Sequence, residues 1–346
     1  MTGRRRLYLD DAPGERRGVV MLDGAPERLM LERGDVAEVF GPGARVGARV
    51  RRIERGLGLC FLDLGQGADA VLQLSVAHKG LSEGAALDVR ITAAARWGKG
   101  PVVQFVGVTD VAPRLIAPSP SLLERLRAAA PGEDIVGGAG AREAADDAEA
   151  AAVATEHALS GGGSLALERT RALTAVDVDV GGGGGADAKR GAGKVNRQAL
   201  AAAARLLRLK GLGGLVVVDL AGRGHDGAAL AAAARAAFAR DMPGVVIGQV
   251  SRLGLMELAL PWRDRPTVEI LCDETGQPSV ETLALRLARQ IERAALPGRK
   301  VRAICTAEIA EVLERLSPAL AERIGPRFEI RVEPGRARDA SEAYTL

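Results

Sequence analysis

Hydrophobic and polar residues alternate in short runs along the first third of the chain, with Gly, Pro and Asp between the runs. Alternation with a period of two is typical of strands that bury one face. Two runs near the N-terminus predict a hairpin, and five further runs between glycine-rich turns predict a small barrel of the OB type. The predicted strands cover residues 6–9, 18–24, 48–53, 58–65, 70–74, 87–91 and 102–105.

The pattern changes after residue 112. A Pro- and Ser-rich stretch leads into an amphipathic segment at 122–130, which predicts a helix, and then into a run of Ala, Glu, Asp and Gly. Such low complexity is typical of linkers. We therefore expect a helix followed by a mobile connector over residues 131–160.

From Ser164 onward, strand-like and helix-like patterns alternate, which favours right-handed crossovers and a sheet covered by helices. The predicted strands are 165–180, 215–219, 245–250, 301–305 and 328–332. The predicted helices are 196–210, 226–240, one carrying Leu283, Leu287 and Ile291, and one between the last two strands. The expected fold class is therefore α/β (α+β) and multidomain, with a barrel near the N-terminus and a small C-terminal α/β part.

Three aspartates stand where ligands of α/β sheets collect, at the carboxyl ends of predicted strands. Asp177 and Asp179 alternate with valines, so both point to one face. Asp219 ends the next apolar strand. If the strands are neighbours, Asp177 and Asp219 converge on an oxygen-only site, the kind that Mg²⁺ prefers. Each aspartate alone could equally cap a helix or meet solvent.

A glycine-rich stretch follows the first of these strands and ends in a false phosphate-loop motif. The motif requires Gly where Ala188 stands and Ser or Thr where Val195 stands, so we expect a flexible loop instead. Three basic residues of this stretch would lie beside the aspartates and could hold phosphates: Lys189, Arg190 and Lys194.

The predicted barrel carries candidate RNA contacts. Phe61 is either a stacking platform or a core residue, and Arg96, Trp97 and Lys99 lie together in a polar turn. OB folds hold single strands by stacking bases on aromatic side chains above a basic groove.

Composition narrows the function classes. Of 346 residues, 47% are hydrophobic and 3% aromatic, the net charge is +3, and no run of about 18 apolar residues exists to span a membrane. No secretory leader is visible, so we expect a cytoplasmic protein.

The cysteines are far apart, which excludes a disulfide framework: Cys60, Cys272 and Cys305. The histidines are scattered as well, which disfavours nucleophilic catalysis: His78, His157 and His225.

Three segments together resemble the ribonuclease E/G family. Residues 164–178 read SLALERTRALTAVDV, residues 207–219 read LRLKGLGGLVVVD, and residues 250–257 read VSRLGLME. The resemblance implies an endoribonuclease that cuts single-stranded RNA at A/U-rich sites with Mg²⁺, or with Mn²⁺. It implies that Asp177 and Asp219 bind the metal, with Asp179 as a further candidate ligand, and that Phe61 and Lys99 contact RNA.

The resemblance also implies an architecture. It assigns residues 1–36 to strands that pack on the catalytic part and 37–112 to an S1-type OB barrel. Residues 113–163 form a shortened connector, 164–262 a mixed catalytic domain (RNase H-like/DNase I-like), and 263–346 a small C-terminal part.

Several departures from the family pattern stand out. Asp179 replaces the usual Asn, Val71 replaces a second barrel aromatic, and the connector is too short for a 5′-phosphate sensor. Only Cys272 remains of the Cys-Pro-x-Cys zinc link, so a shared four-thiolate zinc cannot form. We therefore expect no zinc, no membrane contact and single-stranded RNA as the partner, while a homodimer without a zinc link stays open.

Two functions remain from the sequence. The retained aspartates favour a Mg²⁺-dependent endoribonuclease that acts in RNA processing or decay. The alternative is a non-catalytic RNA-binding protein derived from the same family, which the lost aromatic, sensor and zinc link favour.

Overall fold

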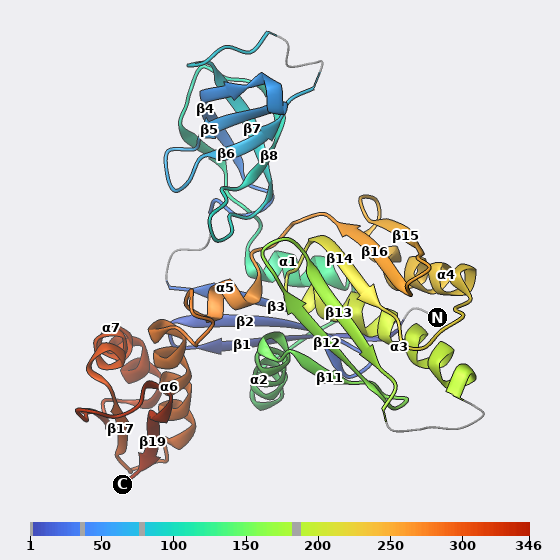
Figure 1. Cartoon of the computed structure of the whole chain (residues 1–346). Coiled ribbons are helices and arrows are strands. Elements are labelled where there is room, and N and C mark those ends of the chain that lie inside the picture. The colour runs from blue at the N-terminus through green and yellow to red at the C-terminus, as the bar shows by residue number, and fades with distance from the viewer. Residues whose placement is uncertain (1–2, 35–38, 76–79, 182–187) are drawn as a thin grey trace.

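Four β-sheets and seven α-helices make up the described part of the chain (Figure 1). The structure is a computed structural model, and it describes residues 3–34, 39–75, 80–181 and 188–346. The predicted mixture of helices and strands is confirmed. His78 and the middle of the glycine-rich stretch lie outside the described residues. Within the described ranges, no helix is both long and apolar enough to cross a bilayer.

The N-terminal hairpin is confirmed and forms the centre of the first sheet. A third strand, which the sequence analysis missed, follows after a tight turn. The strand order is β10-β1-β2-β3, with β1 at Arg5–Ala12, β2 at Glu15–Leu22, β3 at Ala25–Arg33 and β10 at Ile135–Val136. Helix α1 (Leu122–Ala129), which was predicted, buries Leu122 and Leu126 against this sheet.

The second sheet contains all five strands predicted for the barrel and one more. Its order is β5-β6-β8-β7-β4-β9, and β5 also pairs with β4, so the sheet bends back on itself around a buried aliphatic core. The strands are β4 (Arg45–Glu54), β5 (Leu59–Asp63), β6 (Ala70–Gln73), β7 (Ala86–Ala93), β8 (Val102–Val108) and β9 (Arg114–Ala117). We call it the β4–β9 unit; it projects from the rest of the molecule (Figure 1).

The expectation of a mobile connector over 131–160 is wrong. Helix α2 (Ala139–Val153) occupies its centre, and β11 (Glu156–Ala158) follows. Five alanines form its inner face, which packs into the main core and against the first sheet: Ala141, Ala144, Ala145, Ala148 and Ala152. All of them except Ala144 are at most 3% exposed. Alanine has the highest helix propensity, and its small side chain permits close packing without the strong hydrophobic contrast that marks most buried helices.

The third sheet carries the candidate aspartates. Its order is β11-β12-β13-β14-β16-β15. The strands not yet given are β12 (Ser164–Arg169), β13 (Thr174–Asp179), β14 (Gly214–Asp219), β15 (Val246–Val250) and β16 (Leu255–Leu260). Helices α3 (Ala188–Leu209) and α4 (Gly227–Ala237) contribute to the hydrophobic core on one face of this sheet.

The structure of this region differs from the sequence prediction at three points. The single strand at 165–180 is a hairpin, because Thr170 turns the chain by bonding Leu173 and so separates β12 from β13. Strand β16 was not predicted; it pairs antiparallel with β14. Helix α3 begins at Ala188 instead of 196, so residues 191–195 are helical and not a flexible loop.

The C-terminal part has a small sheet of order β18-β17-β19 beside two long helices. Its elements are α5 (Thr267–Leu271), α6 (Val280–Ala294), β17 (Val301–Cys305), α7 (Ala307–Ile324), β18 (Phe328–Val332) and β19 (Glu342–Thr345). The predicted helix with Leu283, Leu287 and Ile291 is confirmed as α6, and both predicted strands are present.

Buried ion pairs join this part to the rest of the protein. The fully buried guanidinium of Arg17 contacts Asp10, Asp146 and Glu149, and Arg289 of α6 bonds Glu149 as well. Removing one member of such a network leaves the opposite charge buried and unpaired, which is strongly destabilising. The network therefore fixes α2 and α6 in place.

The end of α2 is held by a cation. Lys210 Nζ donates to the carbonyls of Ala151, Ala152 and Ala154, where the helix dipole is negative. Burial lowers the pKa of Lys210 to about 8. Burial, followed by the nearby Lys210 charge, also lowers the pKa of His157 in β11, to about 4.

We predict an acid-dependent loss of stability from His157. Because the imidazole has a pKa of about 4 in the folded chain and about 6.5 when unfolded, the unfolded state binds its proton first as the pH falls. The free energy of unfolding should therefore decrease between pH 6.5 and 4. Chemical denaturation at several pH values should show a smaller decrease for His157→Gln. Equal slopes for both proteins would contradict this assignment.

Candidate catalytic site and nucleic-acid surface

Two carboxylates face each other across neighbouring strands at one end of the third sheet. Strand β13 pairs in parallel with β14, and Asp177 is the register partner of Asp219. Both residues are exposed. Adjacent strands lie about 4.8 Å apart, so the two side chains rise from neighbouring positions on the same face. The condition set in the sequence analysis, that the two strands be neighbours, is met.

The alternation of β13 and β14 explains why the aspartates face outward. Val176 and Val178 of β13, and Val216 and Val218 of β14, are at most 5% exposed and belong to the core beneath the helices. Because successive side chains point to opposite faces of a strand, the positions between these valines must lie on the open face. The register then brings the last aspartate of β14 opposite Asp177.

A buried asparagine holds the backbone beside this pair. Asn196 of α3 is fully buried, and its side chain makes two hydrogen bonds with Ala221, two residues after Asp219. Nδ2 donates to the Ala221 carbonyl at 3.0 Å, and Oδ1 accepts from the Ala221 amide at 2.9 Å. The sequence analysis did not single out Asn196, although a lone asparagine among apolar positions of a helix is a usable signal.

Two further acids share the open face. Asp179 follows on β13, and its Oδ1 accepts a hydrogen bond from the amide of Gly181 at 2.9 Å. Glu257 of β16 is the register partner of Val217, and so lies on the same face as Asp219. Among the described residues, no three acidic, His or Cys side chains come close enough to form a metal-binding group. A cation here would rest on two carboxylates.

Such a pair suits a hard divalent cation. Mg²⁺ keeps several waters and is commonly bound by one or two carboxylates together with substrate phosphates. Asp177 and Asp219 are both oxygen donors and both open to solvent. The residues present therefore fit the cation that the sequence analysis expected.

Basic residues on α3 lie at the same edge of the sheet. The start of α3 approaches the loop after β14, since a Cβ on Gly222 would lie 3.2 Å from the Ala192 side chain. Lys194 is exposed on this part of the helix, as is Arg197 one turn further on. The side chains of Lys189 and Arg190 lie outside the described part of the structure.

The β4–β9 unit presents Phe61 on its outer surface. Cys60 and Leu62 on either side are fully buried, whereas Phe61 is half-buried and lies between Val71 and Arg52 on the neighbouring strands. The Arg52 guanidinium covers the ring at 4.6 Å from its centroid. The alternative in which Phe61 is a core residue is thereby disfavoured.

The turn predicted to bind RNA also joins the β4–β9 unit to the third sheet. Arg96 stacks on Trp262, 4.2 Å from the ring centroid, and Arg169 approaches the same ring. Glu269 accepts hydrogen bonds from Arg169 and from the backbone amide of Trp97. Burial lowers the pKa of Arg96.

The remaining side chains of this turn are open to solvent. Trp97 is 37% exposed, and Lys99 is exposed as well. The joint between the two parts lies at the opposite end of β14 from Asp219, because Gly214 contacts Trp262. A six-residue strand separates the two places by about 17 Å.

Comparison with known proteins gives one family match. Residues 134–262 match the model of the Ribonuclease E/G family. The chain is 34% identical over 168 residues to Ribonuclease E of Buchnera aphidicola, covering 44% of this chain and 18% of that protein. It is 32% identical over 170 residues to Ribonuclease E of Escherichia coli (45% and 16%) and 30% identical over 193 residues to Ribonuclease G of Salmonella typhimurium (51% and 39%).

These matches cover less than two-fifths of each of the three relatives. The family match begins after the β4–β9 unit and ends at Trp262, so it contains Asp177, Asp219 and Asn196. The elements that build the carboxylate pair therefore lie within the matched segment.

We predict that Asn196→Ala destabilises the protein and its carboxylate site together. The substitution leaves the partly buried amide and carbonyl of Ala221 without their side-chain partner, which costs about 1–3 kcal/mol in the free energy of unfolding. Thermal denaturation checks the stability. Hydrogen exchange should show faster exchange of the Ala221 amide. A variant with an unchanged free energy of unfolding and unchanged hydrogen exchange at Ala221 would contradict the positioning role of Asn196.

Proposed function

We propose that the protein is an endoribonuclease that hydrolyses phosphodiester bonds of single-stranded RNA with a divalent cation, because residues 134–262 match the model of the Ribonuclease E/G family. The observation that carries the proposal is the register of β13 and β14, which sets Asp177 opposite Asp219 on an open face. We take Mg²⁺ as the cation, with Mn²⁺ as a substitute, because the donor set is made of oxygen atoms.

Each part of the site has a role in this proposal. Asp177 and Asp219 hold the cation, which when bound lowers the pKa of a coordinated water and offsets the charge that develops on the phosphate. Asn196 keeps the backbone after Asp219 in position. Lys194 attracts the phosphates of the strand. Asp179, the further candidate ligand, adds negative charge beside the pair but is not needed as a third ligand in this proposal, since no three such side chains group together among the described residues.

We propose that the β4–β9 unit is an S1-type RNA-binding domain. Supporting this are the outward-facing ring of Phe61, the exposed Trp97 and the exposed Lys99. Aromatic rings stack on bases of any sequence, and flanking cations bind the backbone. Val71 opposite Phe61 offers an aliphatic surface in place of a second ring, so stacking here relies on fewer aromatic groups.

Cleavage of a labelled A/U-rich single-stranded RNA in Mg²⁺ tests the proposal. We predict that Asp177→Asn and Asp219→Asn each lower the cleavage rate at least about hundredfold, because each removes one of the two carboxylate charges that bind the cation. RNA affinity, measured without Mg²⁺, should be retained. Glu257→Gln is the matched control: it removes a carboxylate from the same face outside the pair, and its rate should stay near that of the parent protein.

Substrates with a 5′-monophosphate and a 5′-hydroxyl should be cut equally, since the chain between the β4–β9 unit and β11 forms only α1, β10 and α2, which pack on the first sheet and build no separate domain to bind a 5′-phosphate. RNA binding by the parent protein without any Mg²⁺-dependent product would favour the non-catalytic RNA-binding alternative. Cleavage that survives both aspartate substitutions would place the chemistry elsewhere.

A further inference from the structure

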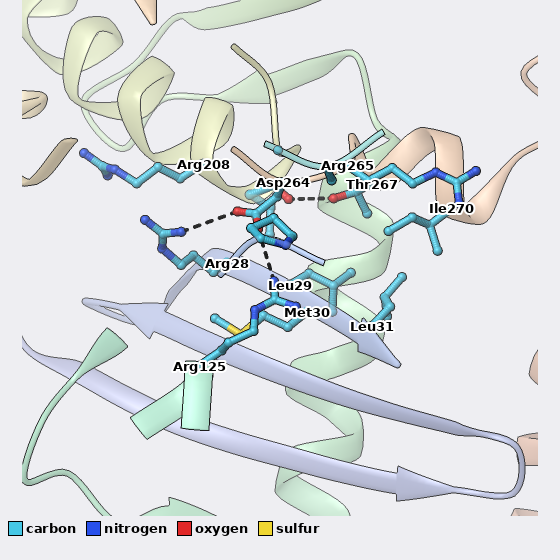
Figure 2. Close-up of a pocket in the computed structure, with 14 residues that line it drawn as sticks. Arg28, Leu29, Met30, Leu31, Arg125, Arg208, Asp264, Arg265, Thr267 and Ile270 are labelled. Carbon is cyan, nitrogen blue, oxygen red and sulfur yellow. Dashed lines mark hydrogen bonds and ion pairs between the residues drawn. The ribbon is translucent and has the colours of Figure 1, made fainter. Parts of the chain in front are cut away.

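A groove lined by arginines lies between the first sheet, α1 and the end of α3, away from the carboxylates. It comprises two neighbouring cavities that share five lining residues: Arg28, Met30, Arg125, Arg208 and Asp264. Figure 2 shows the first of these cavities, with the five shared residues labelled. One cavity also contains Arg5, Glu27 and Arg240. We call the whole the arginine groove.

Two of its arginines are fixed by the fold. Arg5 and Arg208 are less than 10% exposed, and both bond Glu27, which is itself buried. Arg208 is also bonded to Asp241 and to the carbonyl of Ala237. These side chains form the floor of the groove and have few donors left to offer a ligand.

The arginines at the opening are held far less completely. Arg28 and Arg125 are about one-third exposed and share a single acid, Asp264. Arg125 donates to Asp264 at 3.1 Å, while the nearest Arg28 nitrogen is 3.9 Å from the same carboxylate. Figure 2 shows both guanidinium groups converging on Asp264 from different elements. Arg240 is exposed and makes one long contact, 3.5 Å, with the Ala129 carbonyl.

The groove leads toward the exposed tryptophan of the β4–β9 unit. A third cavity, which contains Trp97 and Phe40, shares Ala94 and Arg265 with the first. The three cavities thus follow one another from Trp97 to Arg240. Single-stranded nucleic acid is bound by aromatic rings that stack its bases and by a positively charged groove that follows its phosphates. The three cavities offer both, with the ring at one end and the guanidinium groups along the rest.

We propose that the arginine groove binds phosphate groups of single-stranded RNA, while Trp97 stacks a base at the end of the groove next to the β4–β9 unit. This rests on the proposed function and adds a second contact surface, separate from the carboxylate pair. Arg28, Arg125 and Arg240 bind the phosphates, because a guanidinium fork matches two phosphate oxygens. Asp264 competes with the RNA for Arg28 and Arg125.

Fluorescence anisotropy with a labelled A/U-rich RNA, in EDTA to prevent cleavage, tests this proposal. The double variant Arg28→Gln/Arg125→Gln should bind about tenfold more weakly. Its slope of log K against log salt should be smaller by about 1.4, since two phosphate contacts are lost. The matched control Arg315→Gln/Arg331→Gln removes the same charge from exposed positions of the C-terminal part and should change neither value by as much.

Asp264→Asn should change the RNA affinity in the opposite direction. It frees two guanidinium groups, so RNA should bind about threefold more tightly, whereas a purely structural ion pair would give weaker or unchanged binding. RNAs with a 5′-monophosphate and a 5′-hydroxyl separate the sources of phosphate. Equal losses in the double variant assign the groove to internal phosphates, and a loss on the 5′-monophosphate alone assigns it to the chain end.

Two failures are distinguishable. If the parent protein binds RNA but the groove variants bind as tightly as the control, the groove assignment is overturned and the proposed nuclease stands. If the parent protein binds no RNA at all, both fail.

Discussion

The parallel pairing of β13 with β14 is the contact on which the candidate site depends. It sets the backbones of Asp177 and Asp219 about 4.8 Å apart, so two like charges rise from neighbouring positions on one face and repel each other. The core beneath the strands offsets this cost, because the valines that alternate with the aspartates cannot leave it without exposing the main hydrophobic cluster. The sheet thus holds two like charges in a place where a cation would relieve the repulsion.

The rest of the molecule is arranged along the length of β14. Asp219 stands at one end of this strand, and Gly214 at the other contacts Trp262, on which Arg96 stacks. The surfaces that we propose to bind RNA therefore lie toward opposite ends of β14, with the arginine groove near the joint and Lys194 near the aspartates. A substrate strand that reached both would be held at points about 17 Å apart, which favours an extended RNA over a compact one.

The spacing of hydrophobic and polar residues predicted those helices and strands that have one clearly hydrophobic face and one clearly polar face. The strands of the β4–β9 unit, α1, α6 and the outward direction of Asp177 follow from period and spacing alone. Helix α2 was missed because its buried face is made of alanine, and β12 and β13 were merged because a threonine turn looks like one more polar position. Contacts between distant segments, such as Arg96 on Trp262 or Asn196 on Ala221, leave no local signal of their partners.

A titration with Mn²⁺, followed by electron paramagnetic resonance of the free ion, tests most directly whether the two aspartates hold a cation. One Mn²⁺ should bind per chain in the parent protein, and Asp177→Asn or Asp219→Asn should each lower the affinity at least about tenfold. Glu257→Gln should bind as the parent does. Identical titration curves for the parent protein and Asp219→Asn would contradict the central claim, whatever the RNA experiments gave.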